Sequence, residues 1–287
     1  MNELAITNDS AVVLSGNVFQ TVRASSSAIY FGESSLRVSW RSIFAVVGNT
    51  FHMAVGADST LMYLKGSKQS SSLSVLNNSA VVIRGNIVTS PVKYFIFYRF
   101  ALIVESHSAV VFQGNEMQRS LAVFYPTDSS NIHYNSWLQL SGNLCRESPL
   151  EAFAFFYPRL NLRDSTVSVS GNQFMSSTVS QTMLQISKRP HDLTNGVIVA
   201  ACNTVTGVEE ANYAIPSVYN PTILNCSDPC ALATSCFPAY TTTASSDGCA
   251  CACAEGGHGD ACLPVSVPEP PSIDDADLCL RDVRVDV

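Results

Sequence analysis

The sequence predicts an all-β chain: a right-handed parallel β-helix of about seven coils, followed by a small disulfide-rich module. Three observations support this prediction. A ten-residue phrase, typified by Ser-Ala-Val-Val-Phe-Gln-Gly-Asn-Glu-Met at 108–117, recurs along the first two thirds of the chain. Apolar residues alternate within the phrase, and eight of the ten cysteines fall between Cys202 and Cys262.

An asparagine marks the same point in each copy of the phrase, and glycine precedes it in all but the last copy, where Cys202 stands. The spacings between successive asparagines are 32, 37, 29, 28, 29 and 31 residues. A period in this range is typical of stacked-repeat architectures. The asparagines are Asn17, Asn49, Asn86, Asn115, Asn143, Asn172 and Asn203.

The positions five and three residues before the asparagine, and two after it, are apolar in every copy. The position two before it is mixed, with Ser, Val, Arg, Gln and Ala. A period of two indicates a strand with one buried face and one wet face.

The Gly-Asn pair interrupts this alternation, and both residue types accept a positive φ at low cost. A single left-handed residue there would turn the strand by roughly a right angle, and stacked asparagine amides would bond from coil to coil. The alternative is an ordinary Asn-Gly hairpin turn. The order Gly-Asn, with an apolar position again two residues later, favours a corner.

Shorter strand-like runs separate the phrases, so each repeat offers about three strands, as expected of a parallel β-helix. The alternative is a leucine-rich repeat, which shares the string of Val12, Leu14, Asn17 and Phe19. The rest of each repeat is rich in β-branched, aromatic and serine residues rather than leucine, which favours the β-helix. The runs are Ser27–Phe31, Leu36–Trp40, Thr60–Leu64, Ser72–Leu76, Tyr94–Tyr98, Leu121–Tyr125, Ala152–Tyr157 and Thr182–Ile186.

Charged residues are distributed unevenly along the chain. Residues 1–200 carry 14 Lys and Arg against 11 Asp and Glu, whereas residues 201–287 carry 2 against 12. We therefore expect a β-helix over 1–205, a bridge over 206–225, a Cys-rich module over 226–263 and an acidic tail over 264–287. Nucleic acid is not an expected partner, because such binding requires clustered basic charge.

Clustered cysteines and the sequons at Asn8, Asn77 and Asn225 indicate an oxidising, secretory route. The first residues lack the basic and apolar regions of a signal peptide, and no uncharged apolar stretch reaches 18 residues. These features suggest a segment of a longer, membrane-anchored protein at the cell surface.

Cys251-Ala-Cys253, followed by Gly259 and Cys262, is the closing pattern of an EGF-like module. The alternative is a metal site with His258, but alternate residues of a strand point to opposite faces, so Cys-x-Cys suits zinc poorly. Cys145 occupies an inward position and is expected to be a buried small hydrophobe. The disulfide candidates are Cys202, Cys226, Cys230, Cys236, Cys249, Cys251, Cys253 and Cys262.

The run from Gly248 to Pro264, together with the repeated phrase, resembles the dispersed gene family surface proteins of trypanosomes. The resemblance implies a very large surface protein with β-helix repeats, EGF-like segments and membrane spans elsewhere, in contact with host cells or matrix. It implies no catalytic residue.

We expect a non-enzymatic adhesion or display protein whose partners are host cell-surface or matrix proteins or glycans. No catalytic, metal or cofactor site is predicted, because no two carboxylates occupy matching positions in adjacent repeats, as glycoside cleavage would require. Two alternatives stay open: a carbohydrate-active β-helix of the pectin-lyase type, and a structural or antigenic decoy.

Overall fold

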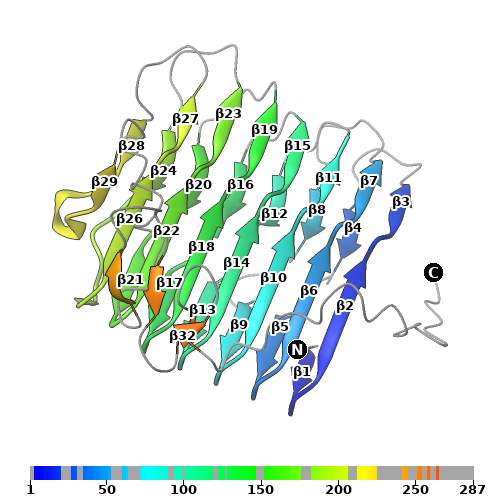
Figure 1. Ribbon diagram of the computed structural model, residues 1–287, viewed down its shortest axis with the longest axis horizontal. Helices are drawn as coiled ribbons and strands as arrows, with labels where there is room; N and C mark the ends of the chain where they lie inside the picture. The colour runs from blue at the N-terminus through cyan, green and yellow to red at the C-terminus, as the bar shows by residue number, and fades with distance from the viewer. Residues whose placement is uncertain are drawn as a thin grey trace.

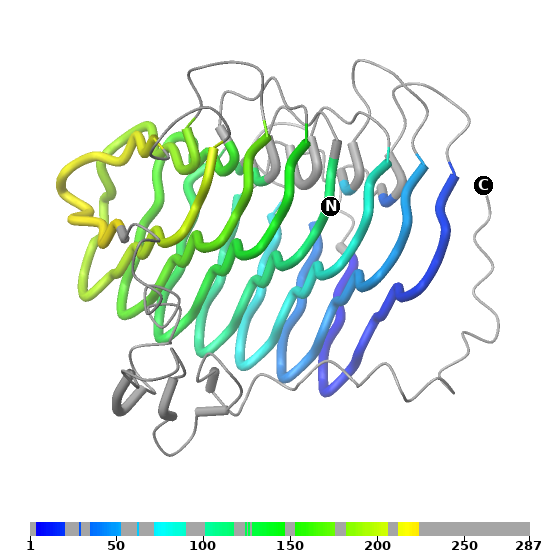
Figure 2. The backbone as a smooth tube through the Cα atoms, turned by 45° about the horizontal axis from the view of Figure 1, so that its top comes forward, coloured from blue at the N-terminus to red at the C-terminus, as the bar shows by residue number. Residues whose placement is uncertain are grey.

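The computed structural model describes residues 3–20, 27–30, 35–52, 60–63, 72–89, 94–98, 101–118, 122–126, 128–146, 152–175, 182–205, 212–224, 241–244, 251–253, 257–258 and 263–264. Within these residues the chain winds into a parallel β-helix, which confirms this part of the prediction (Figures 1 and 2). All strand pairs between neighbouring coils are parallel up to Leu224, so the hairpin alternative is wrong. The only helix in the described part is one 3₁₀ turn, so the leucine-rich repeat alternative is wrong too.

Four sheets run along the coil, and we name them A to D in chain order. Sheet A comprises β1 (Glu3–Thr7), β5 (Ser35–Ser39), β9 (Ser72–Leu76), β13 (Ala101–Glu105), β17 (Ser130–His133), β21 (Leu160–Arg163) and β25 (Leu193–Thr194). Sheet B comprises β2 (Ala11–Ser15), β6 (Ile43–Val47), β10 (Ala80–Arg84), β14 (Ala109–Gln113), β18 (Trp137–Ser141), β22 (Thr166–Ser170), β26 (Val197–Ala201) and β29 (Thr222–Leu224).

Sheet C comprises β3 (Val18–Gln20), β7 (Thr50–His52), β11 (Ile87–Val88), β15 (Glu116–Gln118), β19 (Leu144–Arg146), β23 (Gln173–Met175) and β27 (Thr204–Val205). Sheet D comprises β4 (Ser27–Tyr30), β8 (Thr60–Tyr63), β12 (Tyr94–Tyr98), β16 (Ala122–Tyr125), β20 (Ala152–Phe156), β24 (Thr182–Ile186) and β28 (Asn212–Ala214).

Each coil therefore has four strands rather than the three expected. The repeated phrase contributes two of them, because its Gly-Asn corner separates a strand of sheet B from a strand of sheet C. The expected runs match β5 and β9 of sheet A and all strands of sheet D except β28 closely. The other strands of sheet A, which are β1, β13, β17, β21 and β25, were not predicted.

The core lies inside the coil and consists of the positions that the alternation marked as inward. Val81, Ile83 and Val88 are each at most 1% exposed, and the equivalent residues of neighbouring coils stack on them. Cys145 lies buried among them, as expected. Aromatic side chains continue the stacking, since the Phe19 and Phe51 rings lie 4.8 Å apart and nearly parallel.

The left-handed residue of the corner is the glycine, not the asparagine. Gly16, Gly48, Gly85, Gly114, Gly142 and Gly171 have φ between 61° and 64°, and Cys202 takes the same conformation at 56°. A Cβ on Gly114 would meet nothing within 4 Å, so its need for glycine is conformational rather than steric.

Gly114→Ala is therefore expected to lower the free energy of unfolding by about 1 kcal/mol, the usual cost of a left-handed Cβ. Gly114→Asn should cost clearly less, because asparagine tolerates this region. Urea unfolding of both variants measures the difference. Equal losses would mean that contacts of the new side chain, not φ, determine the cost.

The coil continues past residue 205, where the bridge was expected. Beyond it, β28 adds to sheet D, η1 (Ser217–Tyr219) crosses the end of the core, and β29 adds to sheet B. Tyr219 is 2% exposed, and its hydroxyl donates to the Leu160 carbonyl oxygen at 2.5 Å. Burial raises the pKa of Tyr219 to about 12, so this hydroxyl stays protonated at the closed end.

In the Cys-rich region the structure describes two short antiparallel ladders. One joins β30 (Thr241–Ala244) to β31 (Cys251–Cys253), and the other joins β32 (Gly257–His258) to β33 (Leu263–Pro264). The acidic tail expected over 264–287 lies outside the described residues apart from Pro264.

Candidate functional site

The repeated asparagines form one file along the B–C corner, as the sequence suggested. From Asn49 to Asn172 each is at most 1% exposed, whereas Asn17 is exposed at the first coil and Asn203 is half-buried at the last. The file is therefore an internal feature rather than a surface one.

The amides of this file are saturated with hydrogen bonds. Asn115 shows the pattern: its Oδ1 accepts from the backbone nitrogen of Asn86 at 3.0 Å and from Asn86 Nδ2 at 2.9 Å. Its own Nδ2 donates to the Ile83 carbonyl oxygen and to Asn143 Oδ1, each at 2.9 Å. At the far end, Asn203 Nδ2 donates to the Tyr213 hydroxyl at 3.1 Å, so Tyr213 closes the file. Burial raises the pKa of Tyr213, and the hydrogen bond from Asn203 opposes that rise.

A second file, of serines, lines the A–B corner and was not predicted. The backbone nitrogen of Ser79 donates to Ser108 Oγ, and that of Ser108 to Ser136 Oγ, each at 3.2 Å. Ser79, Ser108 and Ser136 are at most 1% exposed. The signal was present in the sequence, because a serine stands seven residues before the asparagine in every copy except the last, where Gly196 stands.

Just before these serines, each of the first five coils turns through two consecutive left-handed residues. They are Asn8 and Asp9, Trp40 and Arg41, Asn77 and Asn78, Ser106 and His107, and Tyr134 and Asn135. The backbone of this corner is bonded from coil to coil, for example Asp9 nitrogen to Trp40 oxygen at 2.9 Å and Arg41 nitrogen to Asn77 oxygen at 3.0 Å. The unusual backbone is thus held rigidly in place.

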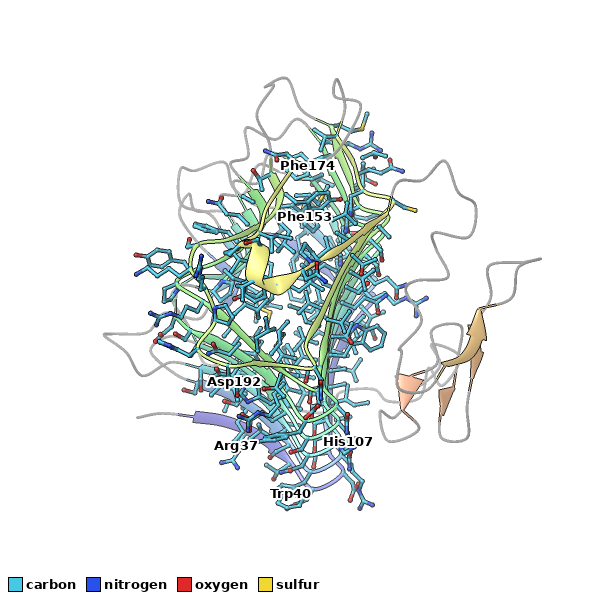
Figure 3. The ribbon with its side chains drawn as sticks, turned by 90° about the vertical axis from the view of Figure 1, so that its left-hand side faces the viewer. Arg37, Trp40, His107, Phe153, Phe174 and Asp192 are labelled. Carbon is cyan, nitrogen blue, oxygen red and sulfur yellow. The ribbon has the colours of Figure 1, made fainter. Side chains whose placement is uncertain are left out.

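The side chains of these turns, which are exposed or half-buried, form a ridge that we name the corner edge. Viewed along the coil, Trp40 and His107 lie at its narrow tip, far from Phe153 and Phe174 in the core (Figure 3). A pocket of about 440 Å³ opens on the corner edge, lined by Asn8, Asp9, Trp40, Arg41, Asn77, Asn78, Ser106 and His107. Trp40 is 57% exposed there.

Charges on the corner edge and the adjoining sheet are paired between neighbouring coils. Arg41 Nη2 lies 2.7 Å from Asp9 Oδ2, and this carboxylate raises the pKa of Arg41. Arg163 Nη2 lies 2.6 Å from Asp192 Oδ2, and Tyr134 and Asp192 together raise the pKa of Arg163. Elsewhere on the coil, Arg146 Nε lies 2.7 Å from Glu116 Oε1.

The structure places the remaining predicted residues as follows. Asn8 and Asn77, two of the three sequon asparagines, lie on the corner edge, and Asn225 is outside the described residues. Cys202 is disulfide-bonded, and its partner is not among the residues whose side chains are described. Cys251 and Cys253 begin and end β31, and Cys226, Cys230, Cys236, Cys249 and Cys262 are outside the described residues.

Among the described residues, no three histidine, cysteine, aspartate or glutamate side chains gather closely enough to hold a metal ion. Nor is any described helix long and apolar enough to cross a membrane.

Comparison with known proteins identifies one family. The model of the DGF-1 N-terminal domain matches residues 160–263, a range that includes the last coils and, apart from Pro264, the two antiparallel ladders. No curated protein and no solved structure matches the chain. This match over residues 160–263 confirms the resemblance to the dispersed gene family of trypanosomes.

Proposed function

We propose that this chain is a non-enzymatic adhesion or display module, exposed at a cell surface as part of a longer membrane-anchored protein. Its partners are host-cell or matrix proteins or glycans. One observation carries the proposal: the buried files repeat the same residue in coil after coil, while the exposed corner edge changes in each coil. Position for position, it presents Asn8, Trp40, Asn77, Ser106 and Tyr134.

A constant buried scaffold with variable exposed side chains suits a display surface. Each coil is fixed to the next by the asparagine amides and by paired backbone groups, so the outward side chains are held at about 4.8 Å intervals. A rigid surface loses little conformational entropy when a partner binds, which favours affinity. Outward residues are free to differ, because they do not contribute to the core.

The carbohydrate-active alternative gains less support. Asp9, Glu116 and Asp192 each face an arginine of a neighbouring coil at 2.6 to 2.7 Å. These carboxylates fasten adjacent coils, whereas a glycosidase needs two that face one bond of the substrate. We also propose that the coil is right-handed, that the Cys-rich region carries EGF-like disulfide pairing and that sequons of the chain are glycosylation acceptors. The antiparallel ladder that contains Cys251 and Cys253 is compatible with the EGF-like pattern.

The test is binding of labelled recombinant chain to cultured mammalian cells and to immobilised laminin, fibronectin and collagen. The chain is produced both in a secretory eukaryotic host and, without N-glycans, in an oxidising bacterial host. We expect saturable binding that unlabelled chain displaces. Signal that rises linearly with concentration on every surface would contradict adhesion. Antibody recognition without any ligand binding would instead favour the decoy role.

A further inference from the structure

We propose that the corner edge is a binding site for a neutral glycan chain, with Trp40 and Tyr134 as its two stacking platforms. This inference rests on the proposed adhesion function and names the chemical class of the ligand. Both aromatic residues adopt a left-handed backbone conformation, which is unfavourable for bulky side chains.

Trp40 has φ of 59° and Tyr134 has φ of 58°. Bulky residues are rare outliers in this region, and such strain tends to persist where function requires it. Equivalent positions of other coils hold Asn8 and Asn77, which adopt it at lower cost. Folding alone would therefore favour asparagine at both aromatic positions.

Both aromatic side chains are presented to solvent. Trp40 is 57% exposed and Tyr134 is 45% exposed. They occupy the same row of the corner edge three coils apart, a separation of about 14 Å at ~4.8 Å per coil. That distance suits a chain of a few sugar units. Pyranose rings present a face of C–H groups that packs on aromatic rings, while the ring edge carries hydroxyls.

The pocket beside Trp40 supplies groups for those hydroxyls. Asp9 contributes a carboxylate, Asn77 and Asn78 contribute amides, and Arg41 contributes guanidinium donors, all lining the same pocket of about 440 Å³. Amides and carboxylates both bond well to vicinal hydroxyls. The backbone beneath these residues is bonded between coils, so the site is already arranged before a ligand arrives.

Charge pairing favours a neutral glycan over a sulfated one. Arg41 is paired with Asp9, and Arg163, whose guanidinium lies 6.0 Å from the Tyr134 ring centre, is paired with Asp192. A sulfated chain would require basic groups that are not already neutralised. Arg41 and Arg163, beside Trp40 and Tyr134, instead present paired, hydrogen-bonding groups. Arg37 is exposed on β5, and the heparin comparison tests whether it attracts a sulfated chain.

The chain provides its own reporter, because its two tryptophans differ sharply in exposure. Trp40 is 57% exposed and Trp137 is 3% exposed. Trp137→Phe leaves Trp40 as the only tryptophan, and acrylamide, a neutral quencher, then measures its accessibility.

The probes are hexasaccharides of β-1,4-linked glucose, galactose and N-acetylglucosamine, with a heparin hexasaccharide as the charged comparison. N-glycans at Asn8 or Asn77 would occupy the same pocket, so the site is proposed for the chain in which these two sequons are unmodified, and the protein is made in an oxidising bacterial host.

At least one neutral hexasaccharide is expected to shift Trp40 emission to the blue and to reduce its quenching constant at least twofold. Tyr134→Ala should weaken that binding about tenfold. Trp40→Asn, which keeps Trp137, should lose binding measured by calorimetry and yet raise the midpoint of urea unfolding, because asparagine suits the left-handed backbone. A purely structural Trp40 would instead lower the midpoint when replaced.

Three results would overturn the proposal: no neutral hexasaccharide protects Trp40 at millimolar concentration, heparin alone protects it, or Trp40→Asn binds as well as the parent chain. Failure of the glycan site can be distinguished from failure of the proposed adhesion function. If Trp40→Asn, made in the bacterial host because the change creates an Asn-Arg-Ser sequon, still binds cells as the parent does, adhesion stands and the corner edge is not its site. If the parent binds no cell or matrix surface but does bind a hexasaccharide, the glycan site stands without adhesion.

Discussion

Asn115→Ala is expected to lower the free energy of unfolding by about 4 kcal/mol, because it leaves several buried polar groups without partners at about 1 to 3 kcal/mol each. The backbone nitrogen and Nδ2 of Asn86 both lose their acceptor, and the Ile83 carbonyl oxygen loses a donor. Asn115 is 0% exposed, so water does not readily replace these bonds.

Its position in the file adds to the effect. In a stacked-repeat protein, stability depends on the interfaces between neighbouring units, so a defect in the middle weakens the coupling of the two halves. Urea unfolding followed by far-ultraviolet circular dichroism measures the loss. A broader or biphasic transition in Asn115→Ala would reveal the weakened coupling directly.

Asn17→Ala is the matched control. Asn17 belongs to the same file but is exposed at the first coil, where its Nδ2 donates to Ser15 oxygen and Asn49 Oδ1. Because water can satisfy the groups left behind, we expect a loss of no more than about 1 kcal/mol. Similar losses in the two variants would show that burial of the amides contributes little.

The sequence revealed the parallel β-helix because this chain repeats itself. Asn115 and its counterparts, with apolar residues at fixed offsets, specify both the corner and the inward face. The fourth strand was missed because the Gly114-Asn115 corner is so compact that two strands read as one phrase. Strands such as β21 were missed because they are short: β21 has four residues, and only Leu160 and Leu162 show the alternation.

The corner edge was harder to predict than the fold. Left-handed turns are recognised from glycine and asparagine, and the pairs at Trp40 and Tyr134 contain neither residue in the first position. Coil-to-coil hydrogen bonds, such as Tyr134 nitrogen to Arg163 oxygen, impose this conformation despite the local preference. The one repeated residue beside these turns is the buried serine that follows each of them. Its hydrogen bonds join residues about 30 apart in sequence, so its role is not visible from local sequence.

The second large effect concerns Gly196, the one position where the serine file is interrupted. Comparison of the seven copies suggests that Gly196→Ser would complete the file and stabilise the chain. The structure predicts the opposite: a Cβ on Gly196 would lie 2.4 Å from Leu162 Cβ and 3.0 Å from Leu193 Cδ1. Leu162 is 0% exposed in the core, so it has little room to move, and we expect a loss of about 2 to 3 kcal/mol.

Gly196→Ala separates the two effects, because it adds the Cβ without the hydroxyl. If the Cβ contact determines the outcome, alanine and serine lower the free energy of urea unfolding by similar amounts. A serine variant more stable than the parent would contradict the predicted clash and show that completing the file outweighs it. The expected loss has a physical origin in the last coil: β25 pairs with β21 through only two residues, Leu193 and Thr194, so Gly196 follows a strand too short to hold the backbone farther from Leu162.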